Sequence, residues 1–407
     1  MKKHNSDYFA DREFECNEKI NQMLEDDLPD FCREFFIGIQ SRTSPLTRLN
    51  YAYDLKVFFR FLVSEIKNFK NCSAKDLAVK DLEKISSFDL EFYLNYLTCY
   101  YGADGRQIKN SENGKARKLS AVRHLYKYFF KKGSLTSNMA ERVDTPKIHD
   151  KEIVRLEKEE IPAILTAAET GDGLGGRQES FHKHTKIRDS AIIALFLGTG
   201  IRNSELVGLN TDDVDFSNNS FVVTRKGGNR VILYFNDEVG GFLRDYYEQR
   251  LANKAASPDD KALFLSLQNS RITTRAVQNI VKKYSGVAAP LKKITPHKLR
   301  STFGTQLYRN TGDIYVVADV LGHKDVNTTK KHYAAITDDI RRKAAVEISI
   351  TDSEKTNKKT DSIGLFICFE KILHRFLCHD FNVFVSQPAL EISRIRRFDG
   401  SVAAQFD

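Results

Sequence analysis

The sequence predicts a mainly helical protein of two domains, the second of which also carries a small antiparallel β-sheet. Three observations lead to this fold class. The chain has 407 residues, which is long enough for two separate cores. Apolar residues recur at spacings of three and four along much of it, the period of a helix with one buried face. Near residues 220–235 that period changes to the pattern of a β-hairpin.

The first domain is expected over residues 28–145 as a set of helices. Leu46–Leu62 has one apolar face, and Asp89–Tyr96 repeats the pattern. Leu119–Phe130 has the same spacing with basic side chains interleaved. A solvated helix face is the simpler interpretation of that basic helix, and contact with phosphates is the alternative. The basic residues are Arg123, Lys127, Lys131 and Lys132.

A linker is expected at residues 146–152, because Asp144–Asp150 contains proline and charge but little apolar sequence. The second domain is then expected over residues 153–346. Gly171–Gly176 is glycine-rich, but it lacks the Lys-Ser/Thr of a phosphate-binding P-loop and follows no predicted strand. We interpret it as a plain loop.

The second domain contains a buried helix, a hairpin and several capped helices. Ile187–Leu197 predicts the buried helix. In the hairpin, Val222-Val223 precedes Arg225-Lys226, a Gly-Gly-Asn turn follows, and Val231–Phe235 runs back. Asn236 is expected to begin the next helix, and another follows from Thr273.

Three further helices are predicted near the end of this domain. Thr295-Pro296 indicates a sharp helix start, with threonine as N-cap and proline in the first turn. Asp313 is expected to cap the next helix, and Gly322 to close it. Asn327 opens a helix that carries Tyr333.

Charge and cysteine content limit the class of protein. The net charge of +9 and pI of about 9.0 make an anionic partner plausible, although a solvated basic surface is the simpler explanation. The six cysteines form no C-x-x-C pair, which suggests reduced thiols in a cytoplasm. No signal sequence is evident, and Ala191–Leu197, the longest apolar run, is too short to span a bilayer. We therefore expect a soluble, cytoplasmic protein without membrane partners.

Chemically useful side chains gather in the last third of the second domain. His297 and Arg300 are three residues apart on one helix, so they share a face. His323 directly follows Gly322, and Tyr333 comes ten residues later. A basic cluster precedes this helix, at an end where the helix dipole also favours an anion. The cluster consists of Lys282, Lys283, Lys292 and Lys293.

Each of these residues has an ordinary explanation alone, but the set and its order are specific. The motifs are Thr199-Gly-Ile-Arg202-Asn-Ser-Glu205, Arg225-Lys226-Gly227, His297-Lys-Leu-Arg300, Leu321-Gly-His323 and Tyr333. In this order they closely resemble the tyrosine recombinase family, which includes phage and transposon integrases and Xer-type enzymes. The resemblance covers residues 30–345. The helical first domain resembles the family's SAM-like core-binding domain, and the mixed α/β second domain resembles its catalytic domain.

The resemblance implies a site-specific recombinase that cleaves and rejoins DNA. Tyr333 matches the nucleophile, which forms a 3′-phosphotyrosine and releases a 5′-hydroxyl. Arg202 and Arg300 match the arginines that stabilise the charge developing on the phosphate, a task suited to planar guanidinium donors. The phosphotyrosine conserves the energy of the broken bond, so no ATP is needed.

The remaining positions imply proton transfer and hydrogen bonding. Lys226 matches the general acid that protonates the departing 5′-oxygen. His297 matches the residue proposed to assist proton transfer at the tyrosine, and His323 matches a further hydrogen-bond donor to the phosphate. Glu205 is expected to be a partner of the basic residues, not a catalyst. Tyr308 and Tyr315 lack the family's position for the nucleophile.

No cofactor or metal is implied, because the arginines take the role of a metal ion. Cysteines and histidines at 368–379 match no standard zinc spacing. The implied partner is double-stranded DNA with specific recombination sites. The implied assembly is a tetramer in the synapse, formed by this chain alone or together with a related recombinase.

Several alternatives stay open from the sequence. A type IB topoisomerase uses similar chemistry, and a non-catalytic DNA-binding relative is a different class of protein. Integration, excision, inversion and dimer resolution share these motifs. Residues 337–350 match the short helix that packs onto a neighbouring subunit in this family. Residues 1–27 and 347–407 are left unassigned, and no arm-binding domain is evident, which favours action at short inverted repeats.

Overall fold

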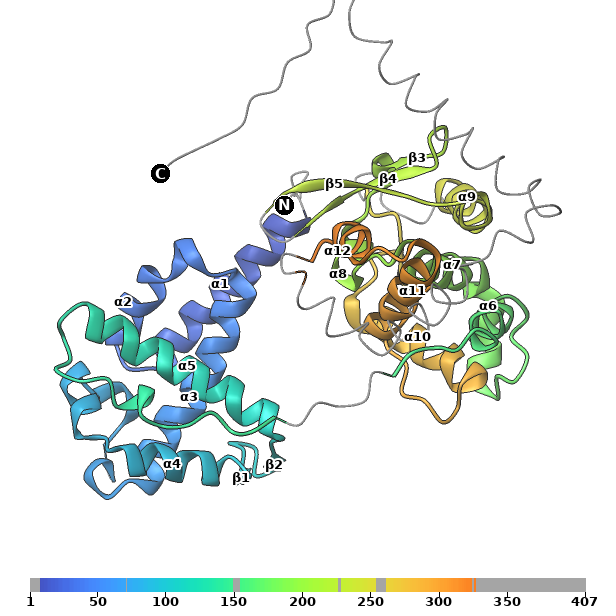
Figure 1. The fold of residues 1–407 in the computed structure, drawn as a ribbon. Coiled ribbons are helices and arrows are strands. Elements are labelled where there is room, and N and C mark those ends of the chain that lie inside the picture. The colour runs from blue at the N-terminus through green and yellow to red at the C-terminus, as the bar shows by residue number, and fades with distance from the viewer. Residues whose placement is uncertain are drawn as a thin grey trace, which may run out of the picture. The chain divides into compact units, whose positions relative to one another are not determined.

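The computed structural model describes residues 8–70, 72–148, 154–225, 228–253, 261–323 and 326 (Figure 1). The main elements are helices, with one two-stranded and one three-stranded antiparallel sheet in the described part. The predicted fold class is therefore confirmed. Over the same residues, no helix is both long and apolar enough to cross a membrane.

Five helices and a short hairpin form the first domain. Ser44 caps α3 by accepting a hydrogen bond from the Thr47 N–H, and proline follows the cap. Ser86 and Asp89 form a reciprocal capping box at the start of α4. The elements are α1 (Tyr8–Asp26), α2 (Phe31–Gly38), α3 (Pro45–Glu65), α4 (Ser87–Tyr96), β1 (Cys99–Tyr101), β2 (Gln107–Lys109) and α5 (Glu112–Lys131).

The core of this domain is rich in aromatic side chains, which bury large apolar areas. Phe58, Phe59, Tyr93 and Phe129 are fully buried there. The segment left unassigned at residues 1–27 includes α1, which contributes Cys16, Ile20, Met23 and Leu24 to this core. The β1–β2 hairpin was not predicted from the sequence.

A buried ionic cluster lies inside the first domain. Asp54 on α3 is only 1% exposed and pairs with Arg117 and Lys118 of α5. Burial raises the pKa of Asp54, and the two cations oppose that shift. Burial also lowers the pKa of Lys118, and Asp54 opposes that shift. The cluster fixes α5 against α3 through the buried Asp54 and Lys118, whereas the Arg117 side chain is about half exposed.

The second domain packs helices around α7 and a three-stranded sheet of order β3-β4-β5 (Figure 1). The predicted hairpin is confirmed, with Thr224 opposite Arg230 next to its turn. The elements are α6 (Glu160–Thr170), α7 (Arg177–Thr199), α8 (Asn203–Gly208), β3 (Val214–Asp215), β4 (Ser220–Thr224), β5 (Arg230–Tyr234), α9 (Asp237–Ala252), α10 (Thr274–Ala288), α11 (Pro296–Thr311) and α12 (Ile314–Leu321). Short 3₁₀ turns occur at Gln40–Arg42, Lys67–Phe69, Ala74–Asp76, Val79–Lys84, Met139–Glu141 and Thr211–Asp213.

Helix α7 is the centre of the second domain, because α6, α9 and α11 all pack against it. Its residues 189–196 are buried throughout, as expected for the predicted buried helix. Asn236, Thr273 and Asp313 each cap the helix that follows by accepting backbone N–H groups. The ends of α7 and α12 are joined by Arg300 near the start of α11, which hydrogen-bonds the carbonyls of Gly200 and Leu321.

Candidate active site

Helix α11 brings His297 and Arg300 into the site on its first two turns. His297 is exposed, whereas Arg300 is only 5% exposed. The guanidinium of Arg300 donates hydrogen bonds to the carbonyl oxygens of Gly200 and Leu321. Thr295 occupies the N-cap position as expected, but its side chain makes no capping hydrogen bond. The prediction that Thr295 is the N-cap residue was therefore right, but the expected hydrogen bond to its side chain is not made.

The turn between α7 and α8 presents Arg202. Gly200 ends α7 with φ +61°, a left-handed conformation that glycine adopts readily. Glu205 then holds Arg202 at two points. Its carboxylate accepts the backbone N–H of Arg202 at 3.0 Å and the side-chain Nη1 at 2.7 Å. Glu205 is 4% exposed, so this ion pair is shielded from water on the carboxylate side.

The two arginines meet at the C terminus of α12. The Leu321 carbonyl accepts hydrogen bonds from both Arg202, at 3.0 Å, and Arg300. Nη2 of Arg202 also donates to the Gly322 carbonyl at 2.7 Å. The last carbonyls of a helix have no partner within it and carry partial negative charge, which suits cations. Gly322, with φ +60°, ends the helix as predicted.

A third arginine reaches the same helix end from the sheet. Arg225 follows β4, and its Nη2 donates to the Val320 carbonyl at 3.1 Å. Arg225 lies within one of the motifs, but the sequence indicated no function for it. Its role at α12 depends on a backbone carbonyl distant in sequence, so no local pattern could have indicated it.

His323 extends from the same turn. Its backbone N–H donates to the Ala318 carbonyl at 2.8 Å, which fixes the residue after Gly322. The structure therefore brings together Arg202, Arg300 and His323 around one helix end, with His297 one turn before Arg300 on α11. Such a group can bind and polarise a phosphate.

Other predicted residues lie outside the described part of the chain. They include Lys226 and Tyr333, the expected helix from Asn327, the expected helix at 337–350, and residues 347–407.

The basic cluster before α11 is partly neutralised. Lys283 donates to Asp189 at 3.0 Å, and Lys292 donates to Glu160 at 2.6 Å. Asp189 also accepts the Tyr284 hydroxyl, so Lys283 belongs to a buried network. Its contribution to a phosphate-binding surface is therefore smaller than the sequence suggests.

One of the basic side chains of helix α5 is likewise engaged in hydrogen bonds within the protein. Arg123 donates to the carbonyls of Ala140 and Val143 and to the Thr145 hydroxyl. It therefore fastens the segment after α5 to the helix. Lys127 and Lys131 stay exposed.

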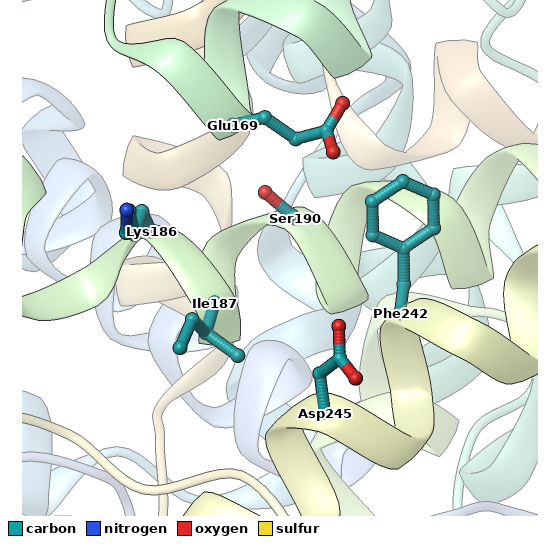
Figure 2. A pocket seen from close by; sticks show the side chains of 6 residues that line it. All are labelled: Glu169, Lys186, Ile187, Ser190, Phe242 and Asp245. Atoms are coloured by element: carbon teal, nitrogen blue, oxygen red, sulfur yellow. The ribbon is translucent and has the colours of Figure 1, made fainter.

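A hollow of about 150 Å³ lies apart from these residues, between α6, α7 and α9 (Figure 2). The carboxylates of Glu169 and Asp245 and the ring of Phe242 surround the Ser190 hydroxyl there. No predicted site residue that the structure describes lines it, and Lys186 offsets part of its negative charge. The predicted site residues Arg202 and Arg300 gather instead at the end of α12.

Comparison with known proteins places both domains. Residues 154–339 match the model of the phage integrase family, and residues 33–133 match that of the phage integrase N-terminal SAM-like domain. The tyrosine recombinase XerC of Caldanaerobacter subterraneus subsp. tengcongensis is 34% identical over 305 residues, covering 73% of this chain and 79% of that protein. The tyrosine recombinase XerD of Lacticaseibacillus casei is 29% identical, over 55% of this chain and 74% of its own length.

Solved structures share the fold. XerH site-specific recombinase bound to palindromic difH substrate, in a post-cleavage complex, matches with a TM-score of 0.57 at 18% identity, covering 84% of this chain and 90% of that one. A lambda integrase dimer bound to a COC′ core site matches with a TM-score of 0.52 at 17% identity, covering 74% of this chain and 93% of that one.

Proposed function

Because this chain belongs to the phage integrase family and is a site-specific DNA recombinase of the tyrosine class, we propose that Tyr333 is its nucleophile. The Tyr333 oxygen attacks the scissile phosphorus, a 3′-phosphotyrosine forms, and the 5′-oxygen leaves as a hydroxyl. Attack by a 5′-hydroxyl on the phosphotyrosine reverses these steps and rejoins the strand. The type IB topoisomerase alternative is not favoured by the similarities.

The observation that carries this proposal is the convergence of Arg202 and Arg300 on the Leu321 carbonyl. The two guanidinium groups come from elements about a hundred residues apart and share one acceptor. A non-bridging phosphate oxygen bound beside that carbonyl would receive charge-assisted hydrogen bonds from both. Such donors stabilise the extra charge of the transition state, and they are already fixed before DNA binds.

Proton transfer is assigned to the other residues of the set. Lys226 protonates the leaving 5′-oxygen as general acid. His297 assists removal of the proton from Tyr333, and its exposure on α11 leaves it accessible to a substrate. His323 donates a hydrogen bond to the phosphate. Glu205 holds Arg202 in place and does not touch the reacting atoms.

The proposed partner is double-stranded DNA carrying a specific recombination site. XerH and the lambda integrase are described as bound to such sites, and the lambda enzyme as a dimer. We propose that this chain assembles as a tetramer in the synapse, with identical or related subunits, and that it works in the cytoplasm.

A suicide substrate tests the nucleophile. A pool of nicked duplexes with a randomised centre is incubated with the protein, and covalent protein–DNA complexes are isolated and sequenced to obtain the site. Wild type should form the complex on that site with EDTA present and without ATP. Tyr333→Phe should bind the same duplex but form none, with Tyr315→Phe as the matched control that keeps activity. A covalent band that persists in Tyr333→Phe contradicts the assignment.

The variant Arg300→Ala distinguishes a role in the cleavage step from a role in DNA binding. Cleavage should fall by at least about 100-fold, because a preorganised donor to the transition state is lost. Binding of the uncleaved duplex should change little. An equal loss of binding would make Arg300 a docking residue.

A further inference from the structure

Arg225 is held in place by both its backbone and its side chain. Its N–H donates to the Asn229 carbonyl at 2.8 Å, and its carbonyl accepts from the Gly228 N–H at 3.0 Å. These two hydrogen bonds close the β4–β5 turn. Lys226 is the next residue in the chain, so the turn that Arg225 anchors is the turn that contains Lys226.

The side chain of Arg225 leaves the sheet and contacts α12. Nη2 donates to the Val320 carbonyl at 3.1 Å. The guanidinium also lies directly against Gly322, where an added Cβ would collide with Nη1. The sheet and the helix end are therefore joined by one side chain, which needs glycine at position 322.

This contact is not the most stable that an arginine can make. The Nε of Arg225 is buried and has no hydrogen-bond partner among the described residues. A buried donor without an acceptor lowers stability. Among the described residues, Arg225 therefore keeps its contact with α12 although one of its donors is left unpaired.

Three consecutive backbone carbonyls at the end of α12 accept hydrogen bonds from three arginines. Val320 accepts from Arg225, Leu321 accepts from Arg202 and Arg300, and Gly322 accepts from Arg202. The turn with Lys226 is thus tied to the same backbone that holds the phosphate-binding arginines.

We infer that Arg225 is a positioning residue that sets the general acid Lys226 against the scissile phosphate. Glycine flanks Lys226 on its far side and again at position 228, where φ is +82°. Glycine restricts the backbone least of all residues, so the neighbouring sequence does little to fix the position of Lys226. The hydrogen bond from Arg225 to α12 restrains the turn instead. This restraint matters because small displacements of a catalytic group slow a reaction strongly. This inference rests on the proposed role of Lys226.

Two suicide duplexes that differ in one atom test it. One carries the natural 5′-bridging oxygen at the scissile phosphate, and the other carries sulfur. In the second, the bond from the tyrosine oxygen to phosphorus forms while the phosphorus–sulfur bond breaks. The sulfur leaves as a thiolate that needs no proton. A variant that impairs the general acid should therefore cleave the sulfur substrate at nearly the wild-type rate. A variant that impairs phosphate binding should cleave both substrates slowly.

Arg225→Ala should slow single-turnover cleavage of the oxygen substrate by about 10- to 100-fold. Its rate on the sulfur substrate should return to within a few-fold of wild type. Lys226→Ala should show the same rescue with a larger initial loss. Arg225→Lys, which can still donate to the Val320 carbonyl, should recover part of the rate. Arg230→Ala is the control, because Arg230 lies on the same hairpin and pairs with Asp213 instead.

An equal loss of rate on both substrates in Arg225→Ala, with Lys226→Ala rescued, would overturn the inference. It would make Arg225 a support for the fold or a phosphate ligand. If Lys226→Ala is not rescued, the general acid itself is wrongly assigned, and the inference fails with it. Melting curves and duplex affinity for each variant separate unfolding from either outcome.

Discussion

Replacing Glu205 with glutamine measures how firmly the carboxylate holds Arg202. Glu205 uses one oxygen for the Arg202 backbone N–H, at 3.0 Å, and the other for Nη1, at 2.7 Å. Glutamine is almost the same size, but one of those two atoms becomes an amide NH₂. Whichever way the amide is turned, a donor then faces a donor. The variant therefore loses one hydrogen bond completely, and the acceptor of the remaining hydrogen bond is no longer charged.

The expected magnitude follows from the burial of the two partners. A hydrogen bond to a charged group contributes about 1.5–3 kcal/mol, against about 1 kcal/mol for a neutral one. The Arg202 side chain is 35% exposed, so water compensates part of the loss. We expect the free energy of unfolding to fall by about 1–2 kcal/mol. Arg202 keeps its bonds to the Leu321 and Gly322 carbonyls, so cleavage should slow by about 10-fold, equivalent to about 1.4 kcal/mol.

Urea unfolding gives the stability change, and single-turnover covalent trapping on the suicide duplex gives the rate. Glu238→Gln is the matched control, because Glu238 lies exposed in the first turn of α9 and should change neither quantity. If Glu205→Gln retains the wild-type stability and rate, the carboxylate does not hold the arginine, and our reading of this ion pair is wrong.

Four other substitutions test three separate parts of the structure. Asp54→Ala should lower the free energy of unfolding by about 3 kcal/mol, because it leaves Lys118 buried without its counter-ion; urea unfolding measures this loss. Gly322→Ala should lower the free energy of unfolding by about 1 kcal/mol, because alanine is strained in the left-handed conformation. It should also slow cleavage, because the added methyl group displaces the Arg225 guanidinium packed against it. Cleavage at the wild-type rate would contradict that contact. Lys127→Ala and Lys131→Ala should each reduce the slope of log affinity against log salt by about 0.9 if each contacts one phosphate, and an unchanged slope would assign them to solvent.

Local signals in the sequence predicted much of the second domain. The hairpin at 220–235, the proline in the first turn of α11, and the Asp313 and Gly322 ends of α12 are all properties of neighbouring residues. The order of the motifs predicted the family, because five spaced elements rarely coincide.

Partners distant in sequence could not be predicted in this way. Lys283 and Lys292 looked like part of one basic surface, yet Asp189 and Glu160 bind them from helices about a hundred residues earlier. Arg123 looked like one more charge on a basic helix, but it binds backbone carbonyls beyond that helix. Side-chain type reveals a charge, whereas only the fold shows which group neutralises it.

The shared acceptor at Leu321 makes Arg202 and Arg300, the two arginines proposed to bind the phosphate, interdependent. Helix α12 has only eight residues, and its final carbonyls hold Arg202 and Arg300 together. Any force that shifts this short helix withdraws support from both guanidinium groups at once. The chain runs on from the same helix end to Tyr333, only ten residues beyond His323. In the proposed mechanism the nucleophile thus follows closely in sequence on the helix end that holds both arginines, and a shift of α12 should weaken the support of both together.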